Sequence, residues 1–335
     1  MEEFEVFTIA GTGEQGDKDG SGNEATFNDP HGIAINNDGT IIVADSGNHK
    51  IKGIDLDGNV FTIAGTGEQG DKDGHGDEAT FNHPYGIAIK DDGTIIVVDS
   101  GNRKIRGIDL DGNVFTIAGT DEIGDKDGPG NEATFNYPYG IAVRNDVTII
   151  VADSYNNKIR GIDLDGNVYT IAGTGEIGNK DGPGNEAIFY YPRGIAIRDD
   201  GTLIVADTCN HIIRGIDPDG NVFTIAGTVE KGDKDGLRNE ATFNHPCGIA
   251  IRNDGTIIVS DTRNHKIRGI DPDGNVYTIA GTRVHGDKDG PGNEATFYFP
   301  CGIAVRNDGT IIVSDTRNNK IKGIRPKKLV KSAIE

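Results

Sequence analysis

Three residues that could ligate a soft metal occupy the same place in three copies of a repeated segment. The string Ile-Ala-Gly-Thr begins at residues 9, 63, 117, 171, 225 and 279, so the repeat is 54 residues long throughout. His31, Cys247 and Cys301 stand between the Pro and the Gly of copies one, five and six. Imidazole and thiolate are zinc ligands, and a closed ring of repeats would put these copies next to each other. They are candidate zinc ligands, although Cys is also a common small buried residue.

A second candidate chemistry is calcium binding. Asp71 and Asp73 flank a Lys and precede a Gly, and this acidic pair recurs in the other copies, with Asn179 replacing the first Asp in the fourth. Alternating carboxylates before a turn supply the oxygen ligands that calcium prefers. The spacing is not that of an EF-hand, and Asp-Gly pairs also form ordinary turns. Both interpretations of Asp71, Asp73 and their equivalents stay open.

One Asp ends a β-branched run in every copy and is followed by Ser or Thr. The six residues are Asp45, Asp99, Asp153, Asp207, Asp261 and Asp315. Such an Asp could support a nucleophile, but catalysis usually needs unlike residues at one place. Six identical copies favour a structural role, in which the carboxylate accepts hydrogen bonds from backbone N–H groups of the turn.

Unlike residues gather at three positions of the repeat, which antiparallel strand geometry places on one face. Between Pro and Gly stand His31, Tyr85, Tyr139, Arg193, Cys247 and Cys301. Before that Pro stand Asp29, His83, Tyr137, Tyr191, His245 and Phe299, and the turn after the second strand carries Tyr155, Arg263 and Arg317. The Asp-Gly turns expected on the opposite face are nearly uniform. Because neutral drift would alter both faces, we predict that the variable face binds a ligand.

The elements that position these residues are short strands. In the second copy, residues 86–89, 94–98, 104–108 and 114–118 are apolar or alternating runs separated by turn residues. Four antiparallel strands per repeat are typical of a propeller blade. The link to the next blade carries Glu-Ala-Thr-Phe-Asn, for which we expect one helical turn and an apolar plug at Phe135.

The two ends of the chain predict a closed ring. Residues 5–11 form a fourth strand without the first three, and residues 302–325 supply three strands without a fourth. The N-terminal strand would complete the last blade and cover its open edge. We therefore predict an all-β, six-bladed β-propeller as a single domain over residues 1–325, with repeats starting near 7, 61, 115, 169, 223 and 277 and a C-terminal tail at 326–335.

Composition narrows the range of partners. The formal net charge is −20, which disfavours nucleic acid and anionic lipid because phosphate binding needs clustered Lys and Arg. No run approaches the length of a membrane helix, and no signal peptide is evident. Three Cys are too few, and odd in number, for a disulfide framework. We expect a monomer in a reducing, cytoplasmic setting.

The repeat resembles the NHL repeat, a family of six-bladed propellers. The resemblance rests on the pattern Pro-x-Gly-Ile-Ala followed by a strand, Asp-Ser/Thr and Asn-x-Lys-Ile, as in residues 30–34 and 43–51. The motif Asn-His-Leu that names the family stands here as Asn48-His49-Lys50. The resemblance implies a fold that carries protein-binding, RNA-binding and sensor modules, and related propellers include metal-dependent lyases and hydrolases.

Three functions follow as hypotheses. The first is a non-catalytic binding module that recognises a protein, peptide or small ligand on the variable face, without a cofactor. The second is a metal-dependent enzyme, a lyase or hydrolase, at the axial funnel, with zinc or calcium as the metal. The third is a ligand-free propeller produced by design or by recent amplification of one repeat.

Overall fold

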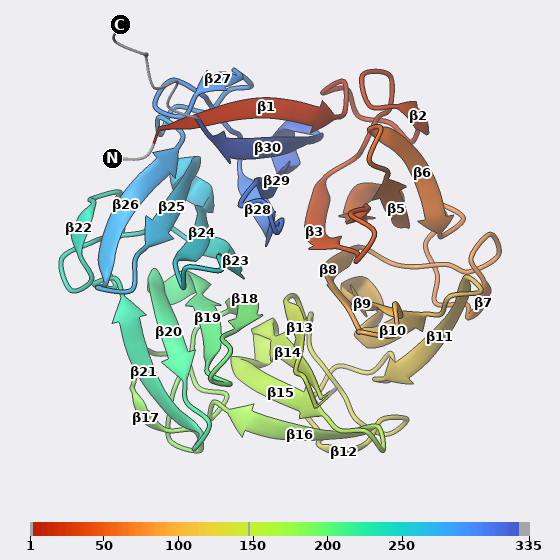
Figure 1. Cartoon of the computed structure of the whole chain (residues 1–335). Coiled ribbons are helices and arrows are strands. Elements are labelled where there is room, and N and C mark those ends of the chain that lie inside the picture. Colours follow the sequence, from red (N-terminus) through yellow and green to blue (C-terminus); the bar gives the residue numbers. More distant parts are fainter. Residues whose placement is uncertain (1–2, 147, 328–335) are drawn as a thin grey trace, which may run out of the picture.

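Six blades surround a central axis, as predicted (Figure 1). The computed structural model of the chain describes residues 3–146 and 148–327. Each blade is an antiparallel sheet whose first strand lies at the axis and whose later strands follow outwards. The innermost strands are β3 (Pro30–Ile35), β8 (Pro84–Ile89), β13 (Ile141–Val143), β18 (Pro192–Ile197), β23 (Pro246–Ile251) and β28 (Pro300–Val305).

The second and third strands of each blade are buried along nearly their whole length, as in the first blade. The second strands are β4 (Ile41–Asp45), β9 (Ile95–Asp99), β14 (Ile149–Asp153), β19 (Leu203–Asp207), β24 (Ile257–Asp261) and β29 (Ile311–Asp315). The third strands are β5 (Lys50–Ile54), β10 (Lys104–Ile108), β15 (Lys158–Ile162), β20 (Ile212–Ile216), β25 (Lys266–Ile270) and β30 (Lys320–Pro326). Their β-branched composition suits a surface that packs against neighbouring sheets.

The outer edge of each blade has one strand more than the four predicted. The fourth strands are β6 (Asn59–Ala64), β11 (Asn113–Ala118), β16 (Asn167–Ala172), β21 (Asn221–Ala226), β26 (Asn275–Ala280) and β1 (Phe4–Ala10). Two residues of the link pair with each as β2 (Gly20–Ser21), β7 (Gly74–His75), β12 (Gly128–Pro129), β17 (Gly182–Pro183), β22 (Gly236–Leu237) and β27 (Gly290–Pro291). Strands this short have no apolar period that a sequence could show.

The ring closes as predicted, by pairing of the N-terminal strand with the last blade. Strand β1 pairs with β30 in antiparallel register, Phe4 opposite Pro326 and Val6 opposite Ile324. Strand β27 pairs with the outer edge of β1. Strand β30 thus extends into the segment expected as a tail, and the rest of that tail, residues 328–335, lies outside the described residues.

The core lies between the blades. Each apolar cluster joins two neighbouring sheets; one, for example, combines Ile33 and Val43 of the first blade with Ile312 of the sixth. The plug predicted at Phe135 is confirmed, because Phe135 and its five equivalents are fully buried. Burying one such ring stabilises the fold by a few kcal/mol.

The helical turn predicted for Glu-Ala-Thr-Phe-Asn lies slightly earlier in the link, where the N–H groups of Glu24 and Ala25 both donate to the Ser21 carbonyl oxygen at 2.8 Å. The Glu-Ala-Thr-Phe segment forms a turn and then a single bridge, such as Gln15 with Phe27. Three-residue helical turns also occur after the second strands, as η1 (Ser46–Asn48), η2 (Ser100–Asn102), η3 (Ser154–Asn156), η4 (Thr208–Asn210), η5 (Thr262–Asn264) and η6 (Thr316–Asn318). None of the helices in the described part of the chain could span a membrane.

The repeated Asp at the end of the second strand has the structural role that the sequence favours. The Asp99 carboxylate is fully buried and accepts hydrogen bonds from the Asn82 backbone N–H at 2.7 Å and the Asn102 side chain at 2.8 Å. The guanidinium of Arg106 donates a third, at 2.7 Å. The carboxylate therefore joins the link, the helical turn and the third strand, rather than capping the helical turn's own N–H groups.

The acidic pair considered for calcium binds cations of the same blade. The Asp71 carboxylate lies 2.6 Å from the Lys104 ammonium, and the Asp73 carboxylate lies 2.6 Å from the Arg106 guanidinium. The fourth blade supports this pairing, because Asn179 replaces the first Asp where Ile212 replaces the Lys. These carboxylates hold the link against the third strand.

The cation that faces the buried Asp differs between blades: it is Lys52 in the first blade and Arg106 in the second. A pH titration can test the effect of this difference. Burial raises the pKa of Asp45, which faces Lys52 at 3.7 Å, to about 7. Burial raises the pKa of Asp99, which faces Arg106 at 2.7 Å, to about 6. A carboxyl whose pKa is raised in the folded state stabilises the fold at low pH, and this stability is lost as the pH rises through the folded pKa.

We predict that Lys52→Arg stabilises the protein, and more so as the pH rises from 6 to 8. Lys52 lies 3.7 Å from Asp45, whereas Asp99 beside Arg106 at 2.7 Å and Asp315 beside Lys322 at 3.4 Å both have a pKa of about 6. An Arg that hydrogen-bonds the carboxylate would lower the pKa of Asp45 towards that value, and one pKa unit corresponds to about 1.4 kcal/mol. Urea unfolding at pH 5 and pH 8 measures the effect. Arg106→Lys is the matched control and should show the opposite sign; equal effects at both pH values would contradict the role assigned to the cation.

Candidate ligand-binding site at the axial mouth

A repeated glycine brings the innermost strands close together at one end of the axis. A Cβ atom placed on Gly32 would lie 2.0 Å from the Tyr85 carbonyl oxygen, and one on Gly248 would lie 2.1 Å from the Cys301 oxygen. No side chain fits there, so neighbouring strands approach at van der Waals distance. The residue before each glycine then carries its side chain to the axis.

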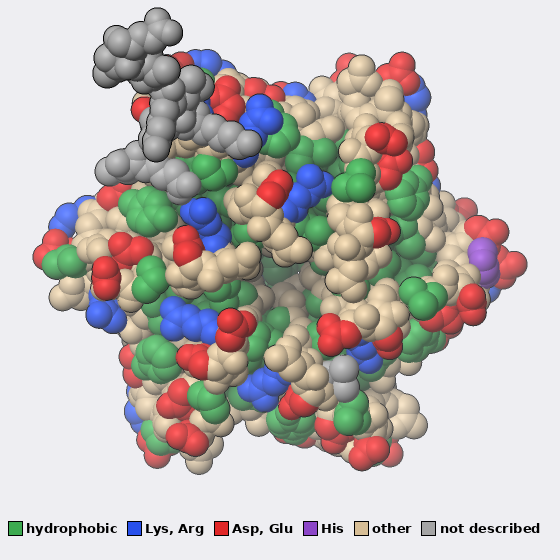
Figure 2. All heavy atoms as spheres, viewed as in Figure 1, with side chains coloured by type: hydrophobic (Ala, Val, Ile, Leu, Met, Phe, Trp, Pro, Cys, Tyr) green, Lys and Arg blue, Asp and Glu red, His purple; other side chains and the backbone are tan. Residues whose placement is uncertain are grey.

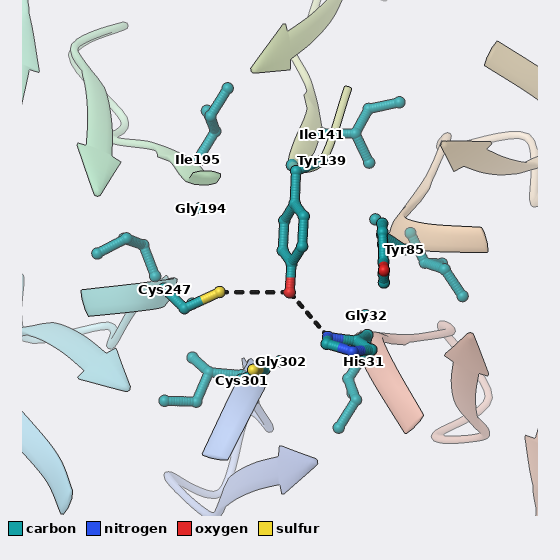
Figure 3. A pocket seen from close by; sticks show the side chains of 17 residues that line it. His31, Gly32, Tyr85, Tyr139, Ile141, Gly194, Ile195, Cys247, Cys301 and Gly302 are labelled. Carbon is teal, nitrogen blue, oxygen red and sulfur yellow. Dashed lines mark hydrogen bonds between the residues drawn. The ribbon is translucent and has the colours of Figure 1, made fainter. Parts of the chain in front are cut away.

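Five of the six variable residues before these glycines line one pocket (Figure 3). They are His31, Tyr85, Tyr139, Cys247 and Cys301. The pocket has a volume of about 100 Å³, and the first isoleucine of each innermost strand closes its apolar wall. Cavities of this order hold one small molecule or a few waters. The structure therefore brings five of the six predicted residues together in one pocket.

Tyr139 lies at the centre of the polar contacts. Its hydroxyl oxygen is 2.7 Å from Nδ1 of His31 and 3.5 Å from Sγ of Cys247, as Figure 3 shows. Its ring stacks on Tyr85 with centroids 4.7 Å apart and an angle of 22° between the planes. The Tyr85 ring holds the Tyr139 ring in place, and the pair forms an aromatic wall of the pocket.

The sixth variable residue, Arg193, supplies the positive charge of this mouth. Its guanidinium lies over the Tyr139 ring, 4.7 Å from the centroid. Burial opposes the charge, but the neighbouring Tyr139 and Cys247 keep the pKa of Arg193 above its usual value. A half-buried cation stacked on an aromatic ring is well placed to bind an anion.

His31 is neutral at physiological pH. Burial lowers the pKa of His31 to about 3, and the positive charges of Arg193 and Arg317 add to the effect. A neutral imidazole offers one donor and one acceptor nitrogen. His31 can therefore exchange a hydrogen bond with Tyr139 or with a ligand without adding charge.

The candidate zinc ligands do not form a ligand set in the structure. The Tyr139 hydroxyl lies between His31 and Cys247 (Figure 3). Among residues 3–146 and 148–327, no three His, Cys, Asp or Glu side chains are grouped so that they could hold a metal ion. This statement also covers Asp71 and Asp73, whose carboxylates bind Lys104 and Arg106.

The other predicted residues surround the pocket as a rim. Tyr137, Tyr155 and Tyr191 form an aromatic cluster. The ring centroid of Tyr155 lies 5.0 Å from that of Tyr137 and 4.8 Å from that of Tyr191. Tyr137 and Tyr155 are exposed. The remaining rim residues are His83, His245, Phe299, Arg263 and Arg317. The rim therefore combines an aromatic cluster with histidine, phenylalanine and arginine side chains.

The sequence analysis missed the residues that hold the rim. The residue before each Pro has a left-handed backbone, with φ of 49° at His83 and 51° at His245. Its N–H binds a side chain of the preceding blade: His83 N–H donates to Nδ1 of His49 at 3.1 Å, and Tyr191 N–H donates to Asn157 at 2.9 Å. The second residue of the Asn-His motif is thus an acceptor that fixes the neighbouring link. Five of the six copies have His or Asn at this position, both acceptors, and this was the signal available in the sequence; the exception is Arg103, whose guanidinium lies 5.3 Å from the centroid of the Tyr137 ring.

The opposite mouth is lined differently. Figure 2 shows this face, where the turns after the innermost strands lie, with Lys and Arg side chains around its central hollow. The basic residues that directly follow these strands are Lys90, Arg144, Arg198, Arg252 and Arg306. Acidic residues follow in every turn; Asp200, for example, accepts a hydrogen bond from the Thr202 backbone at 2.9 Å. The same residue types therefore recur around this face, whereas the variable face carries different residue types in different blades.

The repeat is shared with known proteins. The sequence profile described as "NHL repeat" matches residues 27–54 and 189–216. NHL repeat-containing protein 2 of Gallus gallus is 34% identical over 307 residues, which cover 79% of this chain and 42% of that protein. The chain belongs to the NHL-repeat family. Its NHL propeller spans less than half the length of that relative.

Two further proteins extend the comparison of this NHL propeller. SUPPRESSOR OF QUENCHING 1 of Arabidopsis thaliana, a chloroplastic protein, is 32% identical over 79% of this chain and 27% of its own length. A crystal structure described as an auxiliary nutrient binding protein of Bacteroides thetaiotaomicron superposes with a TM-score of 0.74 at 15% identity, over 98% of this chain and 78% of that one. The second likeness shows the fold alone.

We predict that His31 stays neutral down to about pH 4, whereas His75 titrates above its ordinary pKa. Burial lowers the pKa of His31. The Asp77 carboxylate, 2.6 Å from the exposed His75 ring, raises the pKa of His75. Because the unfolded chain protonates His31 near pH 6.5, its contribution to stability is present above that pH and is lost as the pH falls towards 3. Imidazole NMR titration measures both groups. A His31 midpoint near that of His75 would contradict the buried pocket.

Proposed function

We propose that this NHL propeller is a binding module whose axial pocket on the variable face receives the ring and anionic group of a small ligand or peptide end. The observation that supports the proposal is the set of four different side-chain chemistries at six equivalent positions around one pocket. On the opposite face the turn residues are nearly the same in every copy, so variation is not a general property of the repeat.

The contacts favour a particular ligand chemistry. The stacked Tyr85 and Tyr139 rings suit a planar group, and the guanidinium of Arg193 suits a carboxylate or another anion. Neutral His31 and the thiol of Cys247 supply further polar atoms at the same depth. A ligand that combines an aromatic or sugar ring with a carboxylate would use all of these groups.

The metal-dependent enzyme gains no support from the same residues. Its chemistry needs ligands that converge on one ion, and the described residues do not provide such a group. Binding needs only the pocket, the aromatic wall and the cation. We therefore propose recognition, not turnover, as the function of this face.

We predict that an aromatic carboxylate such as 4-hydroxyphenylacetate binds the protein and raises its melting temperature, and that Arg193→Gln weakens binding about tenfold. The loss follows from one charge-assisted hydrogen bond. Calorimetric titration gives both affinities. Arg198→Gln is the matched control, because it removes a basic residue from the other end of the same strand, β18.

The neutral compound 4-hydroxyphenylacetamide distinguishes the contribution of ring stacking to the affinity from that of the Arg193 charge. It should retain the stacking contribution and lose the dependence on Arg193. Equal weakening by Arg193→Gln and Arg198→Gln would contradict the proposed site, as would equal affinity for the acid and the amide.

A further inference from the structure

Two thiols from neighbouring blades meet in the axial pocket. Cys247 on β23 and Cys301 on β28 occupy equivalent positions of adjacent innermost strands, and their sulfur atoms face the same space (Figure 3). Both are free thiols, with exposed fractions of 1% and 5%. Both line the same pocket, and the backbones at the two thiols touch, because a Cβ atom placed on Gly248 would lie 2.1 Å from the Cys301 carbonyl oxygen. A disulfide needs this proximity without backbone movement.

The backbone beneath the two thiols is fixed by a serine that the other blades lack. The Gly248 N–H donates to Oγ of Ser260 at 2.6 Å, and this hydroxyl donates to the Cys301 carbonyl at 2.6 Å. The equivalent residue is Ser only in the two copies that contain Cys before the glycine; the other four have Ala or Val. Cys and Ser therefore occur together, and the serine ties strand β23 to strand β28 at the thiols.

The two thiols are chemically unequal. Cys247 is beside the guanidinium of Arg193 and 3.5 Å from the Tyr139 hydroxyl, both of which can stabilise a thiolate. The neighbouring Cys301 and the charge of Arg193 lower the pKa of Cys247, against the effect of burial. The pKa of Cys301 is raised well above its usual value by the same partner and by burial. Cys247 is therefore the more readily ionised sulfur of the pair, and Cys301 is the one that keeps its proton.

We propose that Cys247 and Cys301 form a peroxide-sensitive dithiol whose oxidation joins the fifth and sixth blades by a disulfide. The Cys247 thiolate attacks one oxygen of a hydroperoxide; the O–O bond breaks, Cys247 becomes a sulfenic acid, and the other oxygen takes up a proton from solvent, equal to the one that the thiol released, and leaves as water or an alcohol. The sulfur of Cys301 then attacks that of Cys247, the S–O bond breaks, and water leaves with the Cys301 proton. Two thiols are oxidised by two electrons, and the peroxide is reduced.

The disulfide changes the pocket. It replaces the contacts that Cys247 makes with Arg193 and with the Tyr139 hydroxyl by a covalent bond to Cys301. The proposal does not depend on the ligand suggested above, because disulfide formation is measured directly. The third cysteine, Cys209, lies on η4 outside the pocket lining and is an internal control.

The test uses the whole chain treated with one equivalent of hydrogen peroxide at pH 7. We expect the loss of two thiols per chain, a mass decrease of two hydrogens, and a cross-linked peptide pair containing Cys247 and Cys301, with Cys209 unchanged. In Cys301→Ser, dimedone should trap a sulfenic acid on Cys247. In Cys247→Ser, oxidation of Cys301 should be slower by about tenfold or more, in line with its smaller thiolate fraction.

Two further measurements keep the proposal falsifiable if a variant folds poorly. Phenylarsine oxide, which bridges close thiols, should bind the wild-type and Cys209→Ser chains in a one-to-one ratio and should not bridge Cys301→Ser. Arg193→Gln should slow the peroxide reaction and move its pH midpoint upwards, whereas Arg198→Gln should not. Absence of the cross-linked peptide, or oxidation of Cys209 at the rate of Cys247, would overturn the proposal.

Discussion

A buried carboxylate in each blade holds the variable face in place. An unpaired charge at full burial would cost several kcal/mol, so each of these Asp residues needs partners. Asp99 obtains them from three segments: the link before the blade, the helical turn after its second strand and the cation of its third strand. Those first two segments carry the rim residues. The interaction that stabilises the blade therefore also sets the shape of the binding surface.

This network explains why one face of the ring can vary between blades while the fold stays the same. Because the carboxylate, the glycine and the phenylalanine plug fix the backbone in every blade, the side chains before the glycines can differ without altering the fold. The pocket residues His31, Tyr139 and Cys247 come from blades one, three and five, yet they meet at contact distances. Near-identical repeats thus provide a rigid frame on which a few substitutions build an asymmetric site.

The sequence predicted the ring, its closure and the residues of the pocket, because the 54-residue period and the unmatched end strands have only one compact solution. It did not predict the two-residue fifth strands, which have no apolar period. It did not show that Tyr139 separates His31 from Cys247, because distances across the axis depend on side-chain rotamers. The acceptor role of His49 was missed because its partner, the His83 N–H, lies 34 residues away and belongs to the backbone.

The most direct test of this account is a crystal structure of the protein soaked with 4-hydroxyphenylacetate. The account predicts ligand density at the variable mouth, with the ring on the Tyr85–Tyr139 wall and the carboxylate at the Arg193 guanidinium. Density at the opposite mouth, among Arg144, Arg198 and Arg252, would contradict it and would place recognition on the uniform face.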